Sequence, residues 1–276
     1  MRFHHDGPYL AYRGHSMQIF KGKTALITGA SSGIGEEMAR QLASVGCNLI
    51  LVARRTERLD SLAAELASVT VDVITADLSD PQAAEAVYAQ TQSARRQVDI
   101  LINNAGFGFQ KPLLSLPVAD QLGMVDVNVR SLLVLTQRFA APMAQRGQGW
   151  VLNVSSVSAW FPIPGMATYA ASKACVLHLS RALHEELKSA GIVVTALCPG
   201  GTRTEFSSIA RERMDPDLEK AMMPADVVAG AGLKALASGK AVVVPGALYR
   251  VMVSLVRVLP ASWVTRLAGR VMGRHH

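Results

Sequence analysis

The sequence predicts an α/β fold, a Rossmann-type doubly wound parallel sheet of about seven strands with helices on both faces. Two patterns predict it. Short segments are apolar throughout, as strands buried on both faces of a sheet are, and longer stretches with helical periodicity separate them. Strands and helices that alternate in this way form right-handed βαβ units. The candidate strands are Thr24–Thr28, Asn48–Val52, Val71–Thr75, Asp99–Ile102, Trp150–Val154, Val193–Leu197 and Ala241–Val244.

The composition is that of a globular protein with a large core. The chain has 276 residues, of which 50% are hydrophobic and 18% are charged. We expect one Rossmann-type domain over residues 17–246, because no linker rich in Pro, Gly or Ser divides it. Residues 1–16 are expected to be a disordered or loosely packed arm, and residues 247–276 a C-terminal extension.

Cysteine usage and hydropathy indicate a cytoplasmic protein. Cys47, Cys175 and Cys198 are an odd number of thiols without metal-ligand spacing, which is typical of reduced cysteines. We expect no metal site. There is no uncharged apolar run of about 18 residues, so we also expect no membrane-spanning helix.

A glycine-rich turn joins the first predicted strand to the first predicted helix. Glycines allow a tight turn and let the backbone approach a pyrophosphate, while the start of the helix offers unpaired N–H groups. The strand–turn–helix context is the one that a dinucleotide-binding motif requires. The residues expected to bind the cofactor in this turn are Gly29, Ser31, Ser32, Gly33, Ile34 and Gly35.

The glycine spacing, Gly-x-x-x-Gly-x-Gly, resembles the first turn of the short-chain dehydrogenase/reductase family. The resemblance runs from about Lys21 to about Pro245 and includes an Asp-hydrophobic pair, an Asn-Asn-Ala-Gly segment and a Pro-Gly-x-x-x-Thr segment. It implies a nicotinamide cofactor. The further cofactor-binding residues that it implies are Asp77, Leu78, Asn104, Ala105, Gly106, Pro199, Gly200, Thr202 and Thr204.

Two arginines after the second predicted strand indicate NADP rather than NAD. Enzymes specific for NAD place an acidic residue there for the ribose 2′-hydroxyl. Here Arg54 and Arg55 occupy that place, and a guanidinium binds a 2′-phosphate through charge-assisted hydrogen bonds. We expect Arg54 to bind the phosphate, with Arg55 stacked or solvated and Ser31 adding a hydroxyl contact. The competing interpretation is that both arginines simply begin an exposed helix.

A tyrosine and a lysine four residues apart form the candidate catalytic pair. Tyr169 and Lys173 fall on one face of a predicted helix, where the lysine would lower the pKa of the phenol from its usual ~10. Such a tyrosine can protonate a carbonyl oxygen or deprotonate an alcohol. The family resemblance adds Ser156 as the partner of the substrate oxygen, Asn128 as the holder of a relay water, and a contact between Lys173 and the nicotinamide ribose.

The expected activity is therefore NADP(H)-dependent hydride transfer between nicotinamide and a carbonyl or alcohol. Apolar side chains in the loops beside the site favour an apolar substrate. The candidate substrate-binding residues are Phe107, Trp160, Phe161, Met166 and Phe206. Two alternatives remain open: an NADP-binding sensor that has lost catalysis, and a membrane-surface reductase of a lipid-like ketone.

The end of the chain carries the whole excess of positive charge. The net charge is +7, yet no acidic residue follows Asp226. Residues 248–259 and 262–272 form two amphipathic helical patterns divided by Pro260. They could pack on a neighbouring subunit of a homodimer or homotetramer, cover the substrate cleft, or lie on an anionic membrane surface. We expect the first two, and no motif supports nucleic-acid binding.

Overall fold

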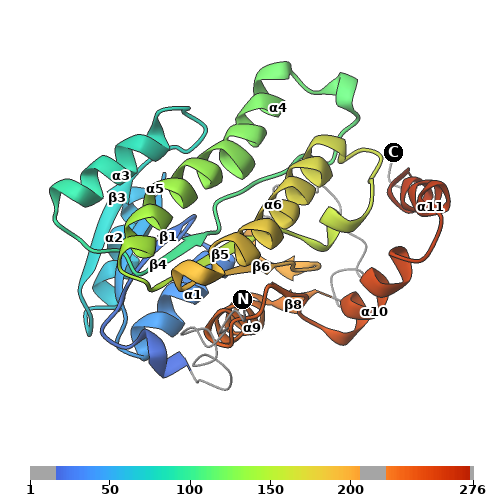
Figure 1. Cartoon of the computed structure of the whole chain (residues 1–276). Helices are drawn as coiled ribbons and strands as arrows, with labels where there is room; N and C mark the ends of the chain where they lie inside the picture. The colour runs from blue at the N-terminus through green and yellow to red at the C-terminus, as the bar shows by residue number, and fades with distance from the viewer. Residues whose placement is uncertain (1–16, 206–221, 274–276) are drawn as a thin grey trace, which may run out of the picture.

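A seven-stranded parallel sheet forms the centre of the computed structural model, which describes residues 17–205 and 222–273 (Figure 1). The strand order is β3-β2-β1-β4-β5-β6-β9, and every neighbouring pair is parallel. The strands are β1 (Thr24–Thr28), β2 (Asn48–Ala53), β3 (Val71–Thr75), β4 (Ile100–Asn103), β5 (Gly149–Val154), β6 (Ile192–Leu197) and β9 (Val242–Val243). The predicted fold class and all seven predicted strands are confirmed.

Helices cover both faces of this sheet. Apolar side chains of α1, α2 and α9 pack on one face, and those of α3 and α5 on the other, where α6 lies against β6. The helices are α1 (Gly33–Ser44), α2 (Thr56–Glu65), α3 (Ala83–Ser93), α4 (Val118–Val125), α5 (Ser131–Gln145), α6 (Ala167–Glu186), α9 (Ala225–Ala237), α10 (Ala247–Val256) and α11 (Ala261–Gly273). Five short turns complete them: η2 (Met17–Phe20), η3 (Leu113–Ser115), η4 (Asp126–Arg130), η5 (Val157–Trp160) and η6 (Lys188–Ala190).

The strands divide their side chains between two cores. Ala25 and Ile27 of β1 belong to the core with α1 and α9, whereas Leu26 points to the core with α3 and α5. Because neighbouring residues of a strand point to opposite faces, each face needs its own apolar set. This two-sided burial explains why the strands are apolar throughout rather than alternating.

The strand order indicates where a ligand would bind on this sheet. From β1 the chain winds to β2 and β3 on one side, and from β4 it winds to β5, β6 and β9 on the other. Ligands of such sheets bind at the carboxyl ends of the strands where the order reverses. In this protein that point lies between β1 and β4.

Two parts of the C-terminal region lie outside the sheet. A small parallel pair, β7 (Thr202–Arg203) with β8 (Met223–Pro224), follows β6 and is not predicted from the sequence. Helices α10 and α11 form one edge of the molecule (Figure 1). Among the helices of the described residues, none is both long and apolar enough to cross a membrane.

Candidate active site

The glycine turn after β1 has the backbone that an anion site requires. Gly29 and Gly33 have φ angles of +66° and +60°, a left-handed region that favours glycine. Ser32, the N-cap residue of α1, makes no side-chain capping bond within the described residues. The first N–H groups of α1 are therefore available to a pyrophosphate.

The loop after β4 is tied to this turn. The Asn104 side-chain nitrogen donates to the carbonyls of Thr28 and Gly29, at 2.9 and 3.1 Å. The Thr28 hydroxyl accepts the backbone N–H groups of Asn104 and Ala105, each at 3.0 Å. Thr28, which was not among the predicted site residues, thus holds the ends of β1 and β4 in register.

The two arginines after β2 point to different places. Arg54 is 72% exposed, with its guanidinium 3.7 Å from the Asp77 carboxylate. Arg55 instead donates to the Ser31 hydroxyl at 3.1 Å and to Glu205 at 2.7 Å. Arg58 donates to the same carboxylate at 2.6 Å. The structure therefore brings Arg55 to the glycine turn, whereas the sequence predicts that role for Arg54.

Asp77 and Leu78, just past β3, have different environments. The Asp77 carboxylate accepts both the N–H and the hydroxyl of Ser79, at 3.0 and 2.8 Å. Leu78 is buried in the core against α3. Both residues lie at the carboxyl edge of the sheet, on the same side as Arg54.

Helix α6 carries the candidate catalytic pair. Tyr169 and Lys173 are both buried, and the Lys173 ammonium is 5.8 Å from the centroid of the Tyr169 ring. The same ammonium donates to the carbonyl of Val154 at the end of β5, at 2.9 Å. Ser156 lies two residues past the end of β5, and its hydroxyl accepts the N–H of Ser158 at 3.1 Å.

Burial sets the proton affinities of this pair. It raises the pKa of the Tyr169 phenol, and hydrogen bonds with Ser156 and Ser158 oppose that rise. Burial also lowers the pKa of Lys173 to about 8. The sequence-based expectation of a lowered tyrosine pKa is thus not met, because the ammonium faces the ring and the Val154 carbonyl. At neutral pH the phenol keeps its proton.

Asn128 lies in η4, a π-helical turn between α4 and α5. Its side chain accepts the N–H of Phe107 at 3.1 Å, and donates to the Phe107 carbonyl and to the Ser172 hydroxyl, each at 3.0 Å. A Cβ on Gly106 would lie 3.0 Å from both the Asn128 carboxamide and the Lys173 ammonium. Asn128 and Lys173 therefore face the same stretch of backbone.

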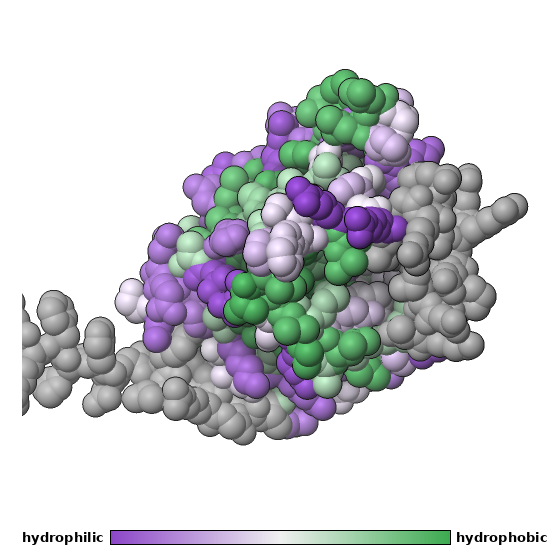
Figure 2. All heavy atoms as spheres, turned by 90° about the vertical axis from the view of Figure 1, so that its right-hand side faces the viewer, coloured by the Kyte–Doolittle hydropathy of each residue, from purple (hydrophilic) through white to green (hydrophobic). Residues whose placement is uncertain are grey.

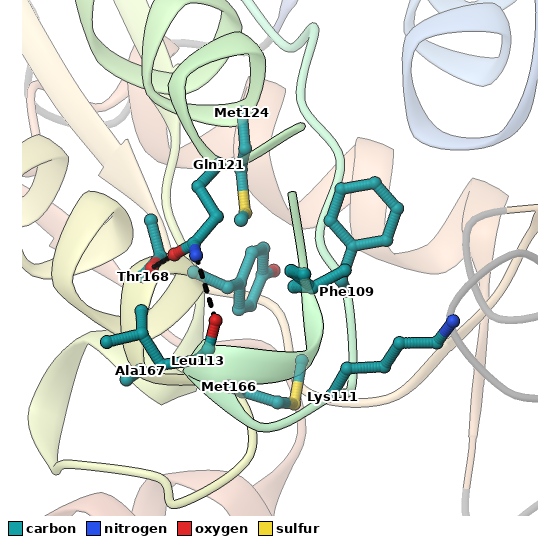
Figure 3. Close-up of a pocket in the computed structure, with 10 residues that line it drawn as sticks. Phe109, Lys111, Leu113, Gln121, Met124, Met166, Ala167 and Thr168 are labelled. Atoms are coloured by element: carbon teal, nitrogen blue, oxygen red, sulfur yellow. Dashed lines mark hydrogen bonds between the residues drawn. The ribbon is translucent and has the colours of Figure 1, made fainter. Parts of the chain in front are cut away.

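A small pocket, partly open to solvent, adjoins Tyr169 (Figure 3). Phe109, Met124 and Met166 give it an apolar lining, and Lys111 extends away at its rim. Gln121 joins its walls, accepting the Thr168 hydroxyl at 2.8 Å and donating to a carbonyl of η3 at 3.1 Å. Gln121, Met124 and Thr168 had not been predicted.

The predicted substrate residues do not all line this pocket. Met166 does. Phe107 instead packs edge-on against Phe109, with ring centroids 5.6 Å apart, and anchors Asn128 through its backbone. The Trp160 ring lies under the Arg257 guanidinium at 5.6 Å. Phe161 is half-buried outside the pocket lining, and Phe206 lies outside the described residues.

The segment after β6 crosses the glycine turn. The Pro199 carbonyl accepts the N–H of Val157 at 2.9 Å, and the Thr202 hydroxyl donates to the Gly200 carbonyl at 3.1 Å. A Cβ on Gly33 would lie 2.8 Å from the Thr204 methyl group. This close approach places Thr204 over the start of α1, where the pyrophosphate would bind.

These features define a nucleotide-binding oxidoreductase. The glycine turn, the free helix N-terminus and the pair of basic side chains fit a dinucleotide, and the Tyr–Lys pair lies at the same edge of the sheet. Within residues 17–205 and 222–273, no three His, Cys, Asp or Glu side chains gather as a metal site would require.

Comparison with known proteins gives the family. Residues 23–215 match the family model of the short chain dehydrogenases, and the chain belongs to this family. It is 37% identical, over 67% of its length and 74% of the relative's, to a sulfoacetaldehyde reductase from Chromohalobacter salexigens. It is 33% identical to a very-long-chain 3-oxoacyl-CoA reductase from Anas platyrhynchos, over 70% of this chain and only 64% of that one.

Solved structures agree with the fold. A short-chain dehydrogenase from Sphingobium yanoikuyae in complex with NADPH is 35% identical to this chain. It superposes with a TM-score of 0.75 over 86% of this chain and 96% of the other.

Proposed function

We propose that this protein is an NADP(H)-dependent oxidoreductase that interconverts a carbonyl and an alcohol, with Tyr169 as the acid and base. The observation that carries the proposal is the junction of the buried Tyr169–Lys173 pair with the glycine turn at one edge of the sheet. When bound, the nicotinamide supplies or accepts the hydride. The remaining chemistry is the movement of one proton, and this falls to the chain's own residues.

The chain's residues divide this proton transfer among them. Tyr169 keeps its proton at neutral pH and can donate it to a carbonyl oxygen. The Ser156 hydroxyl can donate a hydrogen bond to the same oxygen as negative charge develops on it. Lys173, with a pKa of about 8, can return a proton to Tyr169, and Asn128 supports that relay. In the reverse direction Tyr169 must first lose its proton, so oxidation requires a higher pH.

We propose NADP as the cofactor because the end of β2 offers two guanidinium groups and no carboxylate. In the structure Arg55 and the Ser31 hydroxyl form one corner, and Arg54 lies beside Asp77. A 2′-phosphate would take hydrogen bonds from this corner. We assign the phosphate contact to Arg55 and Ser31, with Arg54 bordering the adenosine. The relative solved with NADPH supports the same choice.

An apolar carbonyl or alcohol is the proposed substrate class. The pocket beside Tyr169 is lined mainly by Phe109, Met124 and Met166, and apolar walls favour apolar ligands. The relative named for very-long-chain 3-oxoacyl-CoA supports this choice, whereas the sulfoacetaldehyde reductase does not. The presence of all four expected catalytic side chains argues against a sensor that has lost catalysis.

We further propose a cytoplasmic homo-oligomer. Leu114 of η3 is 98% exposed and Val118 of α4 is 71% exposed. Apolar surface of this kind commonly marks subunit contacts. All three cysteines are free, as in a reducing compartment.

The test is a panel of aldehydes and ketones of graded chain length, followed by NADPH absorbance. We expect turnover with the more apolar members and a lower kcat/KM with NADH. In Tyr169→Phe the kcat should fall by roughly 10²–10⁴-fold, the usual contribution of general acid–base catalysis. Tyr88→Phe, which removes the hydroxyl of an α3 side chain whose ring packs against Phe139, should keep wild-type kcat.

Two outcomes would contradict the proposal. Undiminished turnover by Tyr169→Phe would remove Tyr169 from the mechanism. Tight NADPH binding that no carbonyl ever consumes would favour the sensor.

A further inference from the structure

Helices α10 and α11 expose an unusual amount of apolar surface. Val258 is 79% exposed and Trp263 is 65% exposed, although monomeric proteins rarely leave large apolar side chains gathered in solvent. Figure 2 looks onto the side of the molecule that carries these helices and shows apolar residues gathered across it, with strongly hydrophilic ones beside them. The exposed apolar residues are Leu248, Val251, Leu255, Val258, Leu259, Trp263 and Leu267.

The spacing of these residues makes a continuous face on each helix. On α10 they recur at intervals of three and four residues, which places them on one side, while Val253 on another side is buried. On α11, Trp263 and Leu267 are four residues apart, and Val264 is buried. Each helix thus packs on the protein with one face and presents a second apolar face outward.

The charge of this region is of one sign. Arg250, Arg266 and Arg270 lie on the two helices and Arg257 lies in the turn after α10, and no carboxylate occurs after Asp226. In a two-fold dimer the same patch meets itself, so these arginines would face one another without an acidic partner from either helix. An anionic surface complements this face better than a second copy does.

We propose that α10 and α11 dock this protein on an anionic phospholipid membrane. The apolar faces enter the boundary between headgroups and acyl chains, as amphipathic helices do. The Trp263 ring suits the interfacial layer, and the arginines bind lipid phosphates. The helices lie on the bilayer and do not cross it.

The docking helices also border the proposed active site. The Tyr249 hydroxyl of α10 accepts the N–H of Gly201 at 3.0 Å, and Arg257 lies over Trp160 of η5. On α11, a Cβ at Gly269 would lie 3.3 Å from Pro164, in the loop between η5 and α6. Docking therefore brings the loops around Tyr169 close to the bilayer. If the protein has the proposed function, an apolar substrate would enter the site from the lipid. Only this step of the inference rests on the proposed function.

Vesicle sedimentation of the full-length protein tests the docking without any turnover. We expect it to pellet with vesicles of phosphatidylserine and phosphatidylcholine, and to stay in the supernatant with phosphatidylcholine alone. Arg266→Gln/Arg270→Gln should weaken binding by about tenfold or more, since each arginine contributes about a factor of five near an anionic surface. Trp263→Ser/Leu267→Ser should weaken vesicle binding to a similar degree. Lowering the salt concentration should not restore binding by this variant.

Matched controls lie elsewhere on the surface. Arg181→Gln removes an exposed arginine of α6, and Leu114→Gln removes the 98% exposed side chain of η3. Both should bind vesicles like the wild type. Equal binding to both vesicle types, or equal losses in the control variants, would overturn the proposal. A dimer that Trp263→Ser/Leu267→Ser splits in analytical ultracentrifugation, with no vesicle binding by the wild type, would assign the face to a second copy. An inactive protein that still binds anionic vesicles would contradict only the proposed function.

Discussion

Helices α6 and α10 both border the site, and they depart from the usual pattern of burial in opposite ways. Helix α6 buries polar side chains, among them Ser172, Lys173 and Ser180. Helix α10 exposes apolar ones, such as Leu248 and Leu255. Buried polar groups and exposed apolar patches are the informative exceptions to ordinary burial. The first kind marks chemistry inside the protein, and the second marks contact with something outside it.

The largest effect is expected at the buried cation of α6. Lys173→Met keeps the volume of the side chain but removes the ammonium, so the proton taken from Tyr169 is not replaced. The kcat for carbonyl reduction should fall by roughly 10²–10⁴-fold, measured by NADPH absorbance at saturating substrate. Arg250→Met on α10 is the matched control and should retain the wild-type kcat. An equal loss of kcat in both variants would show that the two helices do not differ in their role in turnover.

The same lysine should make stability depend on pH. Its pKa is about 8 in the folded protein and 10.5 as the ordinary value, so between these values the unfolded chain binds more protons. The buried ammonium therefore lowers the free energy of unfolding by a constant amount below about pH 8, and this penalty fades as the pH rises toward 10.5. Urea denaturation of the wild type and Lys173→Met should give a difference that grows in favour of the wild type from about pH 8 to about pH 10. A constant difference would mean that the ammonium is well solvated.

Two serines with the same local bond compare the helices directly. Ser180 on α6 donates to the carbonyl of Val176 at 2.6 Å, and Ser254 on α10 donates to that of Arg250 at 2.9 Å. Only Ser180 is buried, and only it also accepts the side chain of Asn153, at 2.9 Å. Ser180→Ala should lower the free energy of unfolding by about 1–3 kcal/mol, because it leaves the amide unpaired. Ser254→Ala should change it by less than about 0.5 kcal/mol. Equal losses in urea denaturation would show that burial is not what separates them.

The smallest effect is expected at Glu205, which lies between α6 and α10 in the sequence. The carboxylate of Glu205 holds Arg55 and Arg58 and so competes with a 2′-phosphate for the same guanidinium groups. Glu205→Gln should lower the Kd for NADPH by about tenfold, equivalent to about 1.4 kcal/mol, and leave the Kd for NADH nearly unchanged. Fluorescence titration of both cofactors measures this. A weaker NADPH affinity in the variant would instead make Glu205 a support for the arginines.

The fold and the candidate catalytic pair follow from local patterns in the sequence. The strands are buried on both faces, so their apolar runs mark their ends to within one residue. Tyr169 and Lys173 are four apart in a helix, so they share a face whatever the rest of the chain does. The strand ends and the shared helix face depend on the spacing of nearby residues, which can be read directly from the sequence.

Other features of the site depend on packing between distant segments. Which of Arg54 and Arg55 reaches the glycine turn depends on how the chain leaves β2, since successive side chains there point to opposite sides. The contact of Arg257 with Trp160 joins residues nearly a hundred positions apart. The raised pKa of Tyr169 depends on its burial and on its hydrogen bonds with Ser156 and Ser158. Neither the hydrophobic periodicity nor the motifs of the sequence predict these contacts between distant segments.

The glycines after β4 limit how this enzyme could be redesigned. A Cβ at Gly108 would lie 2.5 Å from the ring of Tyr169, so even alanine would displace the phenol that we propose as acid and base. Libraries that aim at new substrates should therefore leave Gly106 and Gly108 constant. Diversity belongs at Phe109, Met124 and Met166, whose side chains line the pocket.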